Sequence, residues 1–76
     1  MAFTETLYSY RFSATIPEEK FRGFLVEKLK EAEINPMVNE YEGTVTAIGI
    51  ADFRKVIMLV SLFTSYDKTE LFFKAM

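Results

Sequence analysis

The spacing of hydrophobic side chains along the first third of the chain changes once, from every second residue to every third or fourth. Residues 4–14 alternate between apolar and polar positions, which is typical of a half-buried strand. The apolar face consists of Tyr8, Tyr10, Phe12 and Ala14, and the polar face of Ser9, Arg11 and Ser13. Aromatic and β-branched content also favours a strand here.

The following segment predicts a helix. Its apolar residues recur at helical spacing: Phe21, Phe24, Leu25, Leu29 and Ala32. Thr15 and Glu18 have the spacing of a capping box, in which each side chain bonds to the other residue's backbone amide. Pro36 restricts the residue before it, so the helix is expected to end by Ile34. Glu18 and Arg22 stand four residues apart and are expected to pair on the helix surface.

Two further strands are predicted at residues 37–41 and 44–51, joined by a turn at Glu42-Gly43. One face of the second strand is small, with Val45, Ala47, Gly49 and Ala51, and the other has Thr44, Thr46, Ile48 and Ile50. The small face would let a helix approach closely, with Phe21 and Phe24 filling the hollow. Alternatively, Gly49 marks a bulge.

Residues 52–66 fit two structures. As a helix capped by Asp52, the segment has a polar stripe of Arg54, Ser61 and Ser65. As a strand, it has suitable β-branched and aromatic residues but is apolar on both faces. We favour a strand over 55–65, because basic residues in a first turn oppose the helix dipole. The spacing of Asp67 and Glu70 matches a second capping box, which predicts a helix from Lys68 to Met76.

These elements predict one α+β domain spanning residues 1–76. It would be a two-layer structure, an antiparallel sheet with one main helix packed on it, in the order βαβββα. The alternative order is βαββαβ, which is ferredoxin-like and makes residues 70–75 the last strand.

The apolar segment at 55–65 favours association, because a small domain has few elements to cover both of its faces. A large uncovered apolar patch is uncommon on a soluble monomer, so the C-terminal helix, a second copy or a partner must cover it. Adjacent aromatic residues on the C-terminal helix would diverge by about 100°, which turns one of them towards solvent or a partner. The predicted partner-binding residues are Ile57, Leu59, Phe63, Phe72 and Phe73.

Composition narrows the function further. The chain has no cysteine and no histidine, so a thiolate nucleophile, the commonest general base and the usual zinc ligands are missing. The net charge of −2 gives no electrostatic basis for nucleic-acid binding. Rings on the first strand could stack bases, but residues 44–51 lack aromatic and basic partners, so we place those rings in the core. The N-terminus does not resemble a signal peptide and no apolar stretch is membrane-length, which predicts a cytoplasmic protein.

Candidate catalytic groups are sparse. Lys55 with Ser61 or Ser65 could form a dyad, but neither serine lies in a nucleophile motif. Gly43 and Gly49 do not have the spacing of a phosphate-binding loop. We therefore expect a protein that is not an enzyme and that needs no cofactor or metal.

The resulting hypothesis is a small protein-binding module, such as an inhibitor, adaptor or assembly factor, whose size would suit a phage or mobile element. Its partner would be another protein, a second copy of itself, or both, with no role for nucleic acid or membrane. The alternative is a homodimeric ferredoxin-like regulatory domain that binds a small ligand at its interface.

Overall fold

The computed structural model describes residues 6–66 and 68–76. Its elements are β1 (Tyr8–Thr15), α1 (Glu19–Glu31), β2 (Met37–Asn39), β3 (Thr44–Ala51), α2 (Phe53–Phe63) and β4 (Thr69–Ala75). The predicted α+β class is confirmed, and of the two predicted orders the observed one is βαββαβ. Two predictions fall in part outside the described residues. They are the N-terminal segment, including the first residues of its predicted strand, and the predicted cap at Asp67.

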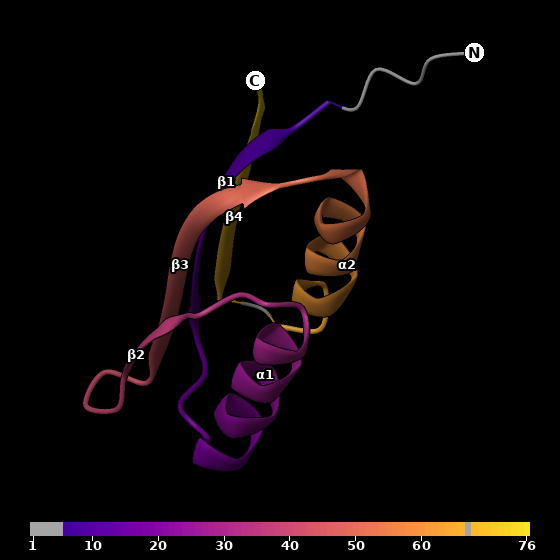
Figure 1. Ribbon diagram of the computed structural model, residues 1–76. Coiled ribbons are helices and arrows are strands. Elements are labelled where there is room, and N and C mark those ends of the chain that lie inside the picture. The colour runs from indigo at the N-terminus through magenta and orange to yellow at the C-terminus, as the bar shows by residue number, and fades with distance from the viewer. Residues whose placement is uncertain (1–5, 67) are drawn as a thin grey trace.

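The four strands form one antiparallel sheet in the order β2-β3-β1-β4. β1 is central, pairing along its full length with β3 on one side and from Tyr8 to Ala14 with β4 on the other. Both helices lie on the same side of the sheet (Figure 1). Among the described residues, no helix lies over the opposite face.

The favoured strand at 55–65 and the helix at 68–76 are both wrong. Residues 53–63 form α2, and Asp52 caps it, since its Oδ1 accepts a hydrogen bond from the Lys55 amide at 3.0 Å. β3 and β4 pair with opposite edges of β1, so the chain between them must cross the sheet. A helix makes that crossing while burying one apolar stripe, and residues 69–75 complete the sheet as β4.

The core lies between the sheet and the helices. Its largest fully buried side chains are Phe12, Leu25, Leu29, Val45 and Leu59. The rings of Phe12 and Phe63 pack with centroids 4.6 Å apart, which links β1 to α2. Tyr10 and Ala14 are also buried, which confirms the predicted apolar face of β1.

The hollow over the small face of β3 is filled by Tyr10, not by the two helix phenylalanines, which are exposed. A Cβ at Gly49 would lie only 2.6 Å from the Tyr10 Oη atom. Gly49 also keeps regular pairing with Tyr10, so it does not mark a bulge. The cross-strand ring explains why this position is glycine.

The start of α1 also differs from the prediction. The N-cap is Glu18, which makes no side-chain capping bond. Thr15 instead belongs to β1, where it pairs with Thr44 and donates its amide hydrogen to the Lys68 carbonyl at 2.9 Å. The extra strand residues take Thr15 out of the cap position, so the predicted capping box is wrong.

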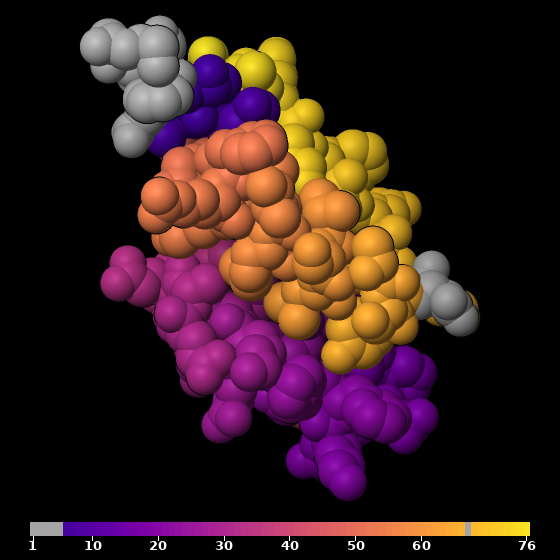
Figure 2. Space-filling model, turned by 90° about the vertical axis from the view of Figure 1, so that its right-hand side faces the viewer, coloured from indigo at the N-terminus to yellow at the C-terminus, as the bar shows by residue number. Residues whose placement is uncertain are grey.

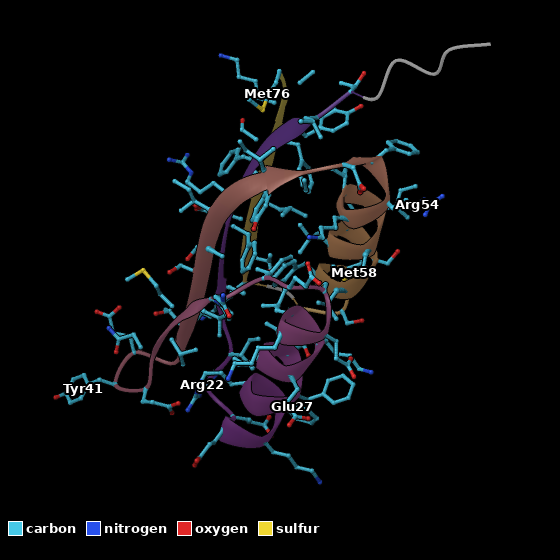
Figure 3. All side chains as sticks on the ribbon, in the orientation of Figure 1. Arg22, Glu27, Tyr41, Arg54, Met58 and Met76 are labelled. Carbon is cyan, nitrogen blue, oxygen red and sulfur yellow. The ribbon has the colours of Figure 1, made fainter. Side chains whose placement is uncertain are left out.

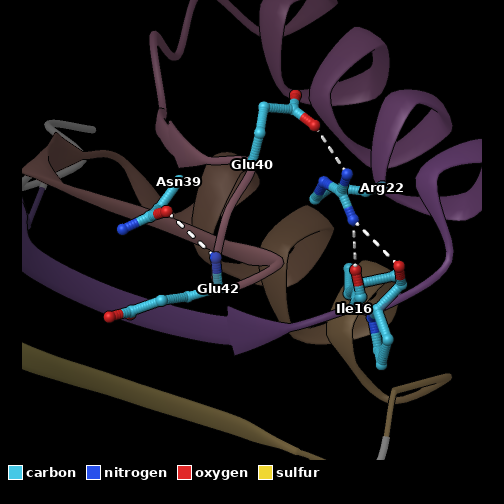
Figure 4. A network of polar contacts seen from close by, with 6 residues as sticks. Ile16, Arg22, Asn39, Glu40 and Glu42 are labelled. Atoms are coloured by element: carbon cyan, nitrogen blue, oxygen red, sulfur yellow. Dashed lines mark hydrogen bonds and ion pairs between the residues drawn. The ribbon is translucent and has the colours of Figure 1, made fainter.

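Arg22 is buried, with an exposed fraction of 5%, and it does not pair with Glu18 as predicted. Its guanidinium donates hydrogen bonds to the carbonyls of Ile16 (2.8 Å) and Pro17 (3.2 Å) and pairs with Glu40 at 2.6 Å (Figure 4). Glu40 lies in the β2–β3 turn, so one side chain ties this hairpin to the start of α1. We call this set of contacts the Arg22 anchor.

Candidate interaction surface

The uncovered face of the sheet presents large hydrophobic side chains from three of its strands. Their exposed fractions are Met37 75%, Ile48 79%, Ile50 57% and Phe72 51%. Successive residues of a strand point to opposite faces of the sheet. The residues of β1 and β3 that point towards the helices are buried in the core, so these four exposed side chains share the side away from the helices. We call these four residues, together with Arg11, the sheet-face patch.

Arg11 lies at the centre of the sheet-face patch. It pairs with Ile48 on β3 and with Phe72 on β4, so all three side chains stand in one row across the sheet. The guanidinium carbon of Arg11 lies 5.1 Å from the centroid of the Phe72 ring, a cation–π contact. Shallow hollows flank this row, one towards Glu70 and the other towards Lys74. Within the described residues, Arg11 makes no ion pair.

The predicted partner-binding residues do not form one surface. Leu59 and Phe63 are buried in the core with exposed fractions of 0% and 3%, so their predicted role in partner binding is wrong. In α2 both side chains point towards the sheet, whereas in the predicted strand they would have pointed to its uncovered face. Phe73 is half-buried and packs against the core. Ile57 and Phe72 are exposed, but on opposite sides of the molecule, since α2 covers the face away from Phe72.

The helical layer, which faces the viewer in Figure 2, has its own exposed hydrophobic residues. They are Phe21 and Phe24 on α1, and Phe53, Ile57 and Val60 on α2. Charged side chains interrupt them: the Nζ of Lys28 lies 5.3 Å from the Phe24 ring centroid, and Glu27 and Arg54 stand on the same layer (Figure 3). In the sheet-face patch, Ile48, Arg11 and Phe72 instead form one continuous row across the sheet, so it is the better candidate for a binding surface.

Sequence reasoning missed most of the sheet-face patch, namely Arg11, Met37, Ile48 and Ile50. A signal was present, because the alternation of residues 44–51 separates Ile48 and Ile50 from the small residues. If the small face packs under a helix, the face with the isoleucines must point away. Phe72 was predicted, although for a helical reason. On a strand, Phe72 and Phe73 point to opposite faces.

The candidate catalytic residues do not come together in the described part of the chain. Asp52 is committed to capping α2, and no hydrogen bond joins Lys55 to Ser61 or Ser65. No group of acidic residues in this part could hold a metal ion. Burial raises the pKa of Tyr10 above its ordinary value, but this side chain is part of the core. The groups considered as catalytic from the sequence are therefore not joined to one another among the described residues.

Comparisons of the chain with protein-family models, with curated proteins and with solved structures find no match. Neither helix among the described residues has the length and apolar character needed to cross a membrane.

Proposed function

We propose that this protein is a non-catalytic binding module that uses the sheet-face patch to dock another protein. The observation that carries the proposal is the row of Ile48, Arg11 and Phe72 across the uncovered side of the sheet. Met37 and Ile50 extend the apolar area beside this row. The patch lies on paired strands backed by the buried core, so little ordering is needed when a partner binds.

The composition of the patch is suited to binding. Fully burying one large apolar side chain contributes roughly 1.5–3 kcal/mol. Because the four hydrophobic residues are already partly covered, a partner would gain a fraction of that from each. Arginine and aromatic residues are the side chains that most often dominate the energy of protein interfaces. In this protein, the Phe72 ring holds the Arg11 side chain against the sheet before any partner arrives.

The charges of the patch indicate the chemistry of the partner. Arg11 is central, and Lys74 lies on the same face of β4, while Glu70 is the one acidic residue beside them. A hydrophobic surface on the partner would cover the apolar side chains of the patch. A carboxylate on that surface would pair with Arg11, since a guanidinium binds a carboxylate through paired hydrogen bonds. The partner we propose is therefore a protein surface that is apolar at its centre and carries an aspartate or glutamate.

The experiment compares parent protein with two patch variants and a matched control in affinity purification from cells. Ile48→Glu and Arg11→Glu place acidic groups in the patch, whereas Val60→Glu makes the same kind of change on the helical layer. We expect the parent and Val60→Glu to recover the same protein in stoichiometric amount, and both patch variants to lose it while keeping their circular dichroism spectra.

Three results would contradict the proposal. They are retention of the protein by Ile48→Glu, loss through Val60→Glu alone, and recovery of nucleic acid in place of a protein. Loss through Val60→Glu would assign binding to the helical layer instead.

A further inference from the structure

The free edge of β4 is long and regular. β4 runs from Thr69 to Ala75 and pairs with β1 without a bulge. At the other edge of the sheet, β2 has only three residues. Edge strands are usually shortened, bulged or covered, because their unpaired backbone groups can pair with another chain. β2 is protected by its length, and β4 has none of these protections in the described structure. Figure 2 shows β4 in yellow along the margin of the molecule.

The hydrogen bonds of β4 determine which of its backbone groups face outwards. The Thr15 amide donates to the Lys68 carbonyl, and the Met76 amide donates to the Leu7 carbonyl, both at 2.9 Å. In an antiparallel pair, residues alternate between bonding to the neighbour and facing away from it. Even-numbered residues of β4 therefore bond to β1, while the amides and carbonyls of residues 69, 71, 73 and 75 point to the free edge.

The sequence of β4 is complementary to itself in the antiparallel direction. If two copies overlap along the full strand, a two-fold axis passes through Phe72, and Glu70 lies opposite Lys74 of the second copy. Residue 71 then lies opposite residue 73, so the outward-facing backbone groups of both copies meet. A shift of two residues keeps that backbone match but places Phe72 opposite a charged residue and leaves strand ends unpaired.

We propose that a second copy of this chain pairs with β4 along its edge, which joins two four-stranded sheets into one continuous sheet. The Glu70–Lys74 contacts and the Phe72–Phe72 contact fall at the pairs without hydrogen bonds, where side chains come closest. On the opposite face, the half-buried Leu71 and Phe73 cover each other across the axis. The interface is isologous and closes as a dimer. It goes beyond the proposed function, because the sheet-face patch can bind a partner in either state.

Charge reversal tests the pairing, its direction and its register together. In E70K both facing positions are basic, and in K74E both are acidic, so each single variant should self-associate about tenfold or more weakly than the parent. An equimolar mixture of E70K and K74E restores two opposite-charge contacts and should form a heterodimer. The double variant E70K/K74E should dimerise like the parent. Glu27→Lys and Lys30→Glu, on the exposed face of α1, are the matched controls and should not change association.

Sedimentation equilibrium at protein concentrations up to about 1 mM measures all of these states. The proposal is overturned if the parent stays monomeric over that range, if the single variants dimerise like the parent, or if their mixture does not associate. Each of these results leaves affinity purification with the patch variants unaffected, so failure of the dimer and failure of the proposed function are distinguishable.

An engineered thiol tests the register separately, because the chain has no cysteine of its own. Residues opposite each other without hydrogen bonds have Cα atoms about 4.5 Å apart, within the range that a disulfide spans. Phe72→Cys should therefore form a covalent dimer on oxidation. Lys74→Cys, on the same face of the same strand, lies four residue pairs from its counterpart in the second copy and should not. Equal cross-linking of the two variants would refute the register.

Discussion

Replacing Arg22 by methionine tests the anchor between α1 and the β2–β3 hairpin. The substitution keeps most of the side-chain length but removes the guanidinium, which donates to the carbonyls of Ile16 and Pro17. The bond to the Ile16 carbonyl is buried, so water cannot readily replace that donor, whereas the bond to Pro17, an exposed residue, is only partly buried. The matched change is Glu40→Gln, which removes the charge on the other side of the same contact.

The structure predicts very different costs for the two changes. Leaving a buried hydrogen-bonding group unsatisfied costs about 1–3 kcal/mol, so loss of the donor to the buried Ile16 carbonyl should make Arg22→Met cost roughly 1–3 kcal/mol. Glu40 has a side chain 70% exposed to solvent, which screens its charge. Glu40→Gln should therefore cost at most about 0.5 kcal/mol. A domain of 76 residues has a total stability of about 4–11 kcal/mol, so the first change removes a large part of it.

Urea denaturation followed by circular dichroism measures both free energies of unfolding. We expect the midpoint for Arg22→Met to fall well below that of the parent, and the midpoint for Glu40→Gln to stay close to it. Equal losses for the two variants would show that the ion pair, and not the carbonyl contacts, accounts for the stabilisation by Arg22. A loss below about 0.5 kcal/mol for Arg22→Met would refute the anchor altogether.

Three further predictions follow from burial, capping and ionisation. Leu59→Ala should cost about 2–5 kcal/mol because it opens a cavity in the core, whereas Val60→Ala, on the exposed side of α2, should cost less than about 1 kcal/mol in thermal unfolding. Asp52→Ala should cost about 1 kcal/mol through loss of the α2 cap, and Thr15→Ala should leave the start of α1 intact, which amide exchange of that first turn would check. Burial raises the pKa of Tyr10 above 10.0. Its contribution to stability is therefore present below pH 10 and is lost as the pH rises through the folded-state pKa. Tyr10→Phe should remove this loss of stability at alkaline pH, in unfolding measured from about pH 9 to about pH 11.

Local patterns in the sequence predict much of the fold but not its second half. The alternation of β1 and β3 and the helical spacing of α1 each depend on one face being buried, and all three elements are found where the pattern indicates. Residues 53–63 carry both helical and strand signals. The crossing between β3 and β4 decides between them, and that requirement comes from the strand order. A helix there leaves residues 69–75 to extend the sheet.

The sheet-face patch could be predicted only in part for a related reason. Ile48 and Ile50 are separated from the small face of β3 by strand alternation alone. The direction of Phe72 depends on residues 69–75 being a strand, and its contact with Arg11 depends on strand order. Arg22 is less predictable still, because its acceptors and Glu40 approach it only after the hairpin folds against α1. Contacts between distant segments leave little trace in local spacing.

Site-specific photo-cross-linking in cells is the most direct test of the sheet-face patch. A photoreactive side chain is placed at Ile48, next to Arg11 in the patch, and in a second variant at Ile57, on the exposed side of α2. We predict that the Ile48 variant forms one dominant covalent adduct with another protein, and that the Ile57 variant forms none. An adduct from Ile57 alone, or no adduct from Ile48, would contradict binding through the open side of the sheet.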